Sequence, residues 1–146
     1  KIRAIEDEKR RAYNEGNTIA AYFYFVDGAY QTNPNALGVA HRNTSMVIFQ
    51  EKIQELSGGL GQVSTELRTS AVMSHEFGHI LGLVDVGSPM VNDHKDEANG
   101  AHCDNQECLM YFAVESSTGL DDLLGMSSPP NLDENCLADL AANGGK

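Results

Sequence analysis

The chain has 146 residues, which is the length of one ordinary domain, and its apolar fraction of 41% predicts a real hydrophobic core. Its formal net charge is -11, and no basic cluster opposes the acidic residues, so we expect no nucleic-acid partner. No apolar run is long enough to cross a bilayer, so we expect no transmembrane segment. We expect a single domain over residues 1–146.

The first half of the chain predicts one helix and several strands. Residues 3–14 are rich in Glu, Lys, Arg and Ala and predict a helix that ends at the Gly16-Asn17 pair. Residues 19–26 are dense in aromatic and β-branched side chains and predict a strand. Residues 38–50 contain two strand-like pieces, and the second piece, 46–49, is apolar throughout, which predicts a buried strand.

The clearest helix of the chain is predicted from about Ser64 to Leu81. Ser64 suits the N-cap, and Glu66 lies in the first turn, where the helix dipole favours a negative charge. One apolar stripe at helical spacing predicts the face that packs on the core. Its members are Met73, Phe77, Ile80 and Leu81.

Gly82 ends this helix, and the chain becomes irregular after it. Residues 86–107 are full of Gly, Asn, Asp and Pro and predict a long loop. Residues 132–142 predict a C-terminal helix. The order of these elements is typical of an α+β fold with a small mixed sheet, a central helix and a C-terminal helix.

Residues 75–79 read His-Glu-Phe-Gly-His and predict a metal site. Positions four apart on a helix lie on the same face, so His75 and His79 can present two imidazoles to one ion. Zinc binds neutral imidazole and tolerates an open fourth position. Such strings also occur by chance in helices without metal, but here the helix has a cap and an apolar face, and Gly82 follows three residues after His79.

Glu76 is predicted to be the catalytic residue beside that metal. It lies about 100° further round the helix than His75, so it can reach a metal-bound water without being a ligand. Zinc lowers the pKa of such a water to about 7. Glu76 can then accept the proton and pass it to the leaving amine of a peptide bond.

The longer string His75-Glu76-x-x-His79-x-x-Gly82 resembles the signature of the metzincin clan of zinc metallopeptidases. The resemblance implies a zinc endopeptidase that acts on peptide or protein substrates and holds one catalytic zinc per chain. It also implies that Gly82 turns the chain sharply toward a third ligand three residues later, where this sequence has Asp85. A carboxylate is acceptable to zinc, and some metzincins use Asp there.

A second candidate for the third ligand comes from the stretch 102–112. Its spacing resembles the archaemetzincin pattern, in which the third His is followed by Cys, four residues, Cys, one residue and the Met of a Met-turn. The matching residues are His102, Cys103, Cys108 and Met110. His102 lies further from Gly82 than that pattern has it, so we expect an insertion over residues 84–101 that leaves and returns near the zinc. We expect His102 to be the third ligand, with Asp85 as the alternative and His94 after it.

The cysteines depart from the archaemetzincin pattern. In that family the two cysteines join a later Cys-x-x-Cys to hold a second zinc, but this sequence has only Cys136 beyond them, so a four-cysteine site cannot form. We therefore expect a Cys103–Cys108 disulfide that pins the loop carrying His102 and Met110, although the cysteine count also fits two reduced thiols at these positions. A disulfide implies an extracytoplasmic location (secreted, periplasmic or surface-anchored), and the start at Lys1 implies a processed or truncated product without its export signal.

Two alternatives stay open at this stage. The acidic run 92–97 can be a calcium site, although it lacks EF-hand spacing, and a solvated loop is the simpler interpretation. The chain can also be a catalytically weak, zinc-dependent binding module, but a pure binder has no need for Glu76 as a base.

The resemblance to metzincins extends more loosely to the strands before the helix. In metzincins an edge strand there runs along the cleft and pairs with an extended peptide substrate.

Overall fold

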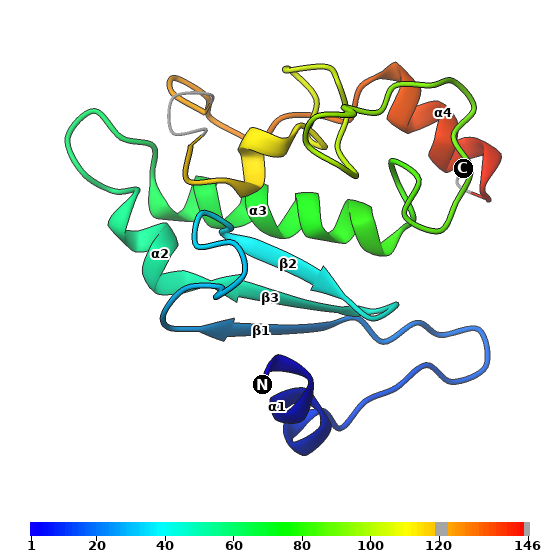
Figure 1. Ribbon diagram of the computed structural model, residues 1–146, viewed down its shortest axis with the longest axis horizontal. Coiled ribbons are helices and arrows are strands. Elements are labelled where there is room, and N and C mark those ends of the chain that lie inside the picture. Colours follow the sequence, from blue (N-terminus) through cyan, green and yellow to red (C-terminus); the bar gives the residue numbers. More distant parts are fainter. Residues whose placement is uncertain (119–122, 145–146) are drawn as a thin grey trace.

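The computed structural model describes residues 1–118 and 123–144 and shows a small α+β fold, as the sequence predicts (Figure 1). The described elements are α1 (Ile2–Lys9), β1 (Tyr22–Val26), β2 (Gly38–His41), β3 (Ser45–Phe49), α2 (Gln50–Glu55), α3 (Thr65–Ile80), the 3-10 helix η1 (Phe112–Glu115) and α4 (Glu134–Ala142). None of the described helices has the length and apolar character needed to span a membrane.

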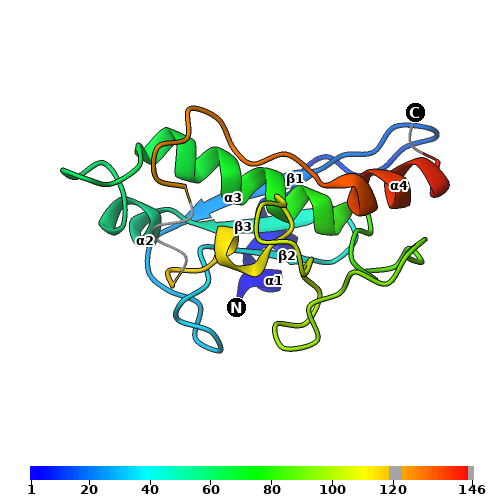
Figure 2. The same cartoon turned by 90° about the horizontal axis from the view of Figure 1, so that it is seen from above.

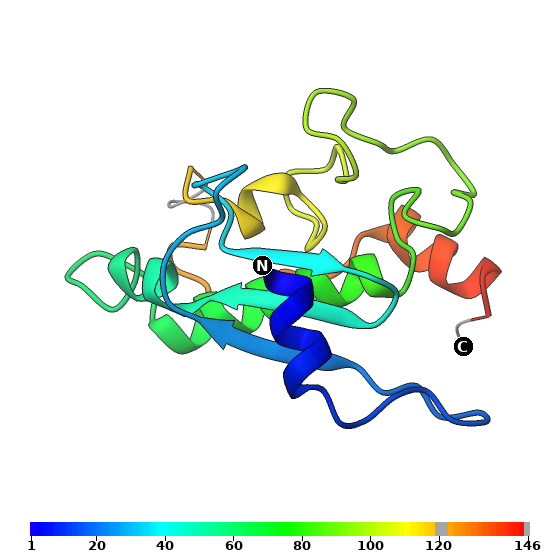
Figure 3. The ribbon, with the colours of Figure 1, turned by 60° about the horizontal axis from the view of Figure 1, so that its bottom comes forward.

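The sheet is mixed, with strand order β1-β3-β2. β1 pairs in parallel with β3, and β2 pairs antiparallel to β3 and forms one edge. All five residues of β3 are buried, which confirms the buried strand predicted from its apolar sequence. α1 and α3 cover opposite faces of the sheet (Figures 1 and 3). α3 is therefore placed with one side against the sheet and another side toward the later loops.

The central helix α3 carries the predicted cap, because the Ser64 hydroxyl accepts a hydrogen bond from the backbone N–H of Leu67 at 3.1 Å. Side chains buried on α3 contact two different cores. One core lies against the sheet and includes Leu37, Ile48 and Val72. The other lies under the C-terminal segment and includes Ala71 and Leu109. Seen from above, α4 lies beside the C-terminal end of α3 (Figure 2).

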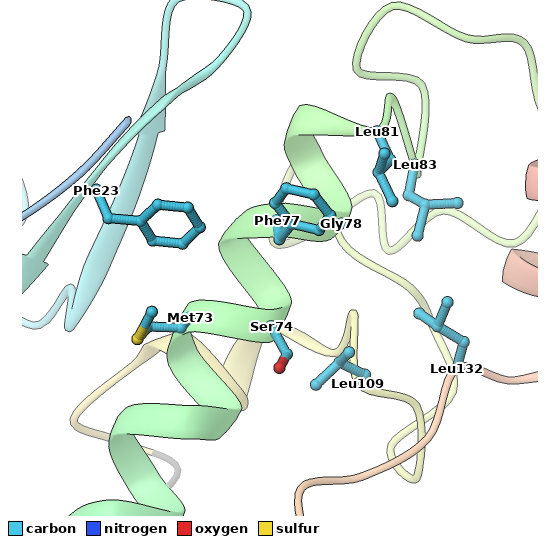
Figure 4. A pocket seen from close by; sticks show the side chains of 9 residues that line it. All are labelled: Phe23, Met73, Ser74, Phe77, Gly78, Leu81, Leu83, Leu109 and Leu132. Carbon is cyan, nitrogen blue, oxygen red and sulfur yellow. The ribbon is translucent and has the colours of Figure 1, made fainter. Parts of the chain in front are cut away.

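The predicted core-facing stripe of α3 is only partly right. Met73 and Ile80 pack against the sheet core, but Phe77 and Leu81 remain 38% and 44% exposed. They line an open apolar hollow of about 420 Å³ together with Phe23 and residues of the later loops (Figure 4). The apolar stripe does not predict which residues of α3 are buried, because the helix is covered on two sides. Polar residues such as His75 are buried as well.

α1 ends earlier than its composition predicts. The helix stops at Lys9, and Arg10 has the extended backbone φ -65°, ψ 133°. This turn lets the Arg10 guanidinium donate to Glu6 at 2.8 Å, to Ser45 at 2.9 Å and to the carbonyl of Ala20 at 2.7 Å. The hydrogen bonds from Arg10 to Ser45 and Ala20, which lie outside α1, thus override the local helix propensity.

Candidate metal centre

Three histidines from two parts of the chain converge beside α3. His75 and His79 lie one turn apart on the helix, and His102 returns to them at the end of the loop. The ring centroid of His102 lies 5.2 Å from that of His75 and 5.4 Å from that of His79. Potential ligand atoms of these three residues and of Glu115 all lie within 4.8 Å of one another. This geometry is suited to a single metal ion.

Backbone carbonyls orient two of the rings. The carbonyl of Leu109 lies 2.7 Å from Nδ1 of His75, and that of Asn99 lies 2.7 Å from Nδ1 of His102. A carbonyl only accepts, so both Nδ1 atoms carry a proton, and Nε2 is the ring atom of each histidine that could bind a metal. Nε2 of His75 lies 3.2 Å from Nε2 of His79. Such a fixed tautomer is the usual outer support of a metal-binding histidine.

The electrostatics of α3 favour neutral imidazoles. Burial lowers the pKa of His75, which is fully buried. Burial, with the nearby His75, lowers the pKa of His79 to about 3. Both rings are therefore unprotonated near neutral pH, which is the form that binds zinc.

Glu115 in η1 completes the group, and the sequence did not single it out. Its carboxylate lies 3.1 Å from Nε2 of His102 and 3.9 Å from Nε2 of His75. Burial alone would raise the pKa of Glu115, but the hydrogen bond with His102 outweighs this effect and lowers the pKa to about 2. The same contact raises the pKa of His102 against the effect of burial. No sequence spacing links a loop carboxylate to a helical histidine pair, so no sequence signal was present.

Glu76 follows His75 on α3, but it lies outside the group of potential ligands. Its side chain is fully buried, and burial together with the charge of Glu115 raises its pKa well above the usual value. The adjoining cleft of about 300 Å³ is lined by Glu76, His79, His102 and the edge strand β2 at 38–40. The predicted base thus lies between the histidines and an edge strand.

Gly38 at the start of β2 makes room for Glu76. A Cβ atom at this position would lie 2.5 Å from Oε1 and 2.8 Å from Cγ of Glu76, and 2.8 Å from Cγ1 of Val72. Both neighbours are buried, so neither can move aside freely.

We expect Gly38→Ala to displace the Glu76 carboxylate and to lower kcat/KM for peptide hydrolysis about 10²-fold while zinc content stays unchanged, because displacement of a reacting group by about 1 Å has that effect. The comparison is steady-state hydrolysis beside elemental analysis. Gly59→Ala is the matched control, because its Cβ would meet only the flexible amide of Gln62. Equal losses in both variants would contradict a role of Gly38 in placing Glu76.

Asp85, the alternative third ligand, is placed elsewhere. Its side chain is 58% exposed and lies 3.4 Å from Nζ of Lys95. Gly82 turns the chain at φ +90°, and Val84 and Asp85 follow with φ of +52° and +63°. This left-handed backbone, unusual for a β-branched residue, directs the chain away from the helix. Among residues 1–118 and 123–144, the structure therefore brings His102 and not Asp85 to the histidine pair.

The segment 84–101 forms a long loop that runs out from the end of α3 (Figure 3), and His102, which follows it, lies beside His75 and His79. Met110 is buried under α3, where a Cβ atom on Gly78 would collide with its sulfur. The carbonyl of Met110 accepts from the backbone N–H of Cys103 at 2.9 Å. The methionine thus packs below the histidines without joining their ligand group.

The predicted Cys103–Cys108 disulfide is wrong, because Cys103, Cys108 and Cys136 are all free and buried in the structure. The Cys103 thiol donates to Asp133 at 3.2 Å, and Cys108 Sγ lies 3.7 Å from Cys136 Sγ. The loop thiols thus meet α4, a helix that the local spacing of two cysteines does not reveal. The extracytoplasmic location loses its disulfide argument and stays a prediction.

His94 lies outside the ligand group of His75 and His79, and the acidic run around it is held by local contacts. His94 is buried and lies beside Cys103 and Asp139. Asp96 closes a local turn by accepting from the backbone of Ala98 and the side chain of Asn99. In the described part of the chain, neither group of potential metal ligands includes a carboxylate of residues 92–97.

Comparison of the chain with models of known protein families, with curated proteins and with solved structures finds no match. The function of the chain must therefore be inferred from its own side chains and their arrangement.

Proposed function

We propose that the chain is a zinc-dependent endopeptidase of the metzincin kind, similar to archaemetzincins. The observation that carries the proposal is the convergence of His75, His79 and His102 with Glu76 at the edge of their cleft. Three histidines with an open fourth position are the ligand set of many catalytic zinc sites. The Met110 turn and the motif spacing of α3 support the same family.

In the proposed hydrolysis, the histidines would bind the metal and Glu76 would act as the base. The Nε2 atoms of the three histidines would hold zinc, which supplies a lowered pKa for water and polarises the substrate carbonyl. Glu76 accepts the proton of the attacking water and delivers it to the leaving nitrogen. A cation at the histidines would favour the ionised form of the buried Glu76 carboxyl. Metal binding would therefore also keep Glu76 in the deprotonated form that can accept a proton.

The substrate would lie along β2. This strand forms an edge of the described sheet and lines the cleft at 38–40. An edge strand offers backbone donors and acceptors to an extended peptide and gives affinity that is independent of the peptide sequence. We therefore propose extended peptide or protein segments as substrates.

The proposal predicts a chelator-sensitive peptidase. Protein purified without chelator should contain zinc and hydrolyse casein, should lose that activity with 1,10-phenanthroline, and should regain it on addition of Zn²⁺. Elemental analysis and release of soluble peptides measure both properties. Casein hydrolysis that survives complete removal of zinc would contradict the proposal.

A second candidate function is a zinc-dependent binding module without catalysis. The observation that favours it is Glu115, whose carboxylate belongs to the same ligand group and would close the fourth position. In that case the zinc-loaded protein would leave casein intact, and Glu115→Gln would open the position. An active wild-type enzyme excludes this alternative.

A further inference from the structure

A second convergence of potential ligands lies between the loops after α3 and the helix α4. Cys103, Cys108 and Cys136 are fully buried, and His94 is 1% exposed. Potential ligand atoms of His94, Cys103, Asp133 and Cys136 lie within 4.8 Å of one another. Cys108 Sγ lies 3.7 Å from Cys136 Sγ, and none of the three thiols is in a disulfide. Two of the three buried thiols thus belong to one group of potential ligands, and the third, Cys108, adjoins that group through Cys136.

The backbone around Cys108 supports a thiolate. Its sulfur accepts hydrogen bonds from the backbone N–H groups of Met110 and Asp133, each at 3.4 Å. The thiolate is the form of cysteine that binds metals.

The contacts of the two ring nitrogens of His94 are typical of a metal-binding histidine. Its Nδ1 lies 3.4 Å from Cys103 Sγ, and its Nε2 lies 2.8 Å from the buried carboxylate of Asp139. Asp139 accepts the Nε2 proton, so the Nδ1 lone pair points toward the sulfur. A carboxylate behind a histidine fixes the tautomer and raises the basicity of the ligating nitrogen.

We propose that His94, Cys103, Cys108 and Cys136 form a second, structural zinc site. Asp133 also lies within reach, but its Oδ1 accepts from the backbone N–H of Cys136 at 2.9 Å and caps α4, and its Oδ2 accepts from Asn105 at 3.2 Å. Thiolate is the better fourth ligand for zinc, so Asp133 stays the cap. The site differs from a four-cysteine site, because the segment 84–101 supplies a histidine.

This site would stabilise the loop that presents His102. Cys103 follows His102 directly and donates its backbone N–H to Met110. Zinc at the cysteines would join the inserted segment, the Met110 turn and α4, which come together around this one cluster. The inference does not depend on the proposed peptidase activity, because none of its four ligands belongs to the first group.

The test isolates this site in the full chain with the double variant His75→Ala/His79→Ala, which lacks the candidate catalytic ligands. We expect it to retain about one zinc per chain when purified without chelator, against about two for the wild type. Co²⁺ added to the metal-free double variant should give intense thiolate-to-cobalt charge-transfer absorption. Cys136→Ser in that background should weaken Co²⁺ binding by orders of magnitude, because a four-ligand site becomes a three-ligand one.

Asp133→Asn is the matched control, since Asn caps helices as well as Asp and should leave the absorption unchanged. Absence of thiolate charge transfer in both the wild type and the double variant would overturn the proposal. So would a Cys108–Cys136 disulfide in zinc-supplemented protein, detected as two missing free thiols. Absorption lost in Asp133→Asn but kept in Cys108→Ser would overturn the ligand set. Retained absorption in an inactive protein supports this site and refutes only the peptidase.

Discussion

Glu76→Gln is expected to remove peptide hydrolysis and to leave zinc bound. The amide keeps the size of the side chain but cannot accept the proton of the attacking water, and a general base contributes about 10²–10⁴-fold to the rate. Glu76 lies outside the ligand group, so the histidines should hold the metal as before. The measurement is kcat/KM on a peptide substrate beside elemental analysis of the same sample.

The matched control is Glu66→Gln, which changes an exposed carboxylate on the first turn of the same helix. This variant should keep wild-type activity, because its side chain lies far from the histidine turn along α3. Undiminished hydrolysis by Glu76→Gln would remove Glu76 from the mechanism. Loss of zinc together with activity would instead make Glu76 a ligand and would contradict the arrangement of the site.

His102→Ala is expected to lower zinc affinity by orders of magnitude, and Asp85→Ala is expected to change it little. The first substitution converts a three-ligand site into a two-ligand one. The second removes an exposed carboxylate whose contact is with Lys95. Competition with a chromophoric chelator measures the zinc affinity of both variants beside that of the wild type.

A loss of only about 10–100-fold in His102→Ala would be typical of a supporting residue rather than a ligand. The reverse result, with Asp85→Ala losing the metal, would mean that the segment 84–101 rearranges when zinc binds. The chain would then follow the Asp spacing of the metzincin signature, and the convergence of His102 would describe only the metal-free protein.

Local sequence patterns predicted the elements whose causes are local. Ser64 caps α3 because its hydroxyl reaches a backbone N–H three residues on, and β3 is buried because residues 46–49 are all apolar. The end of α1 and the exposure of Phe77 escaped prediction because contacts distant in sequence decide them. Arg10 leaves the helix and donates hydrogen bonds to Ser45 and to the carbonyl of Ala20, and α3 is covered on two sides.

The candidate site was predictable where a motif fixes the spacing. The pair His75 and His79 follows from helix geometry, and His102 follows from its spacing to Met110. Glu115 and the meeting of Cys136 with the loop thiols depend on how separate segments pack, which no spacing rule describes. The wrong disulfide arose from treating two nearby cysteines as partners when the third lies on the opposing helix.

The central claim is a zinc held by the three histidines. X-ray diffraction from crystals of the zinc-loaded chain, recorded on both sides of the zinc absorption edge, locates the metal directly. The account predicts an anomalous peak for zinc about 2.0–2.1 Å from each Nε2 atom of His75, His79 and His102. Glu76 should lie beside the zinc without being bound to it. An anomalous map with no peak at these histidines, from protein shown to carry zinc, would contradict it.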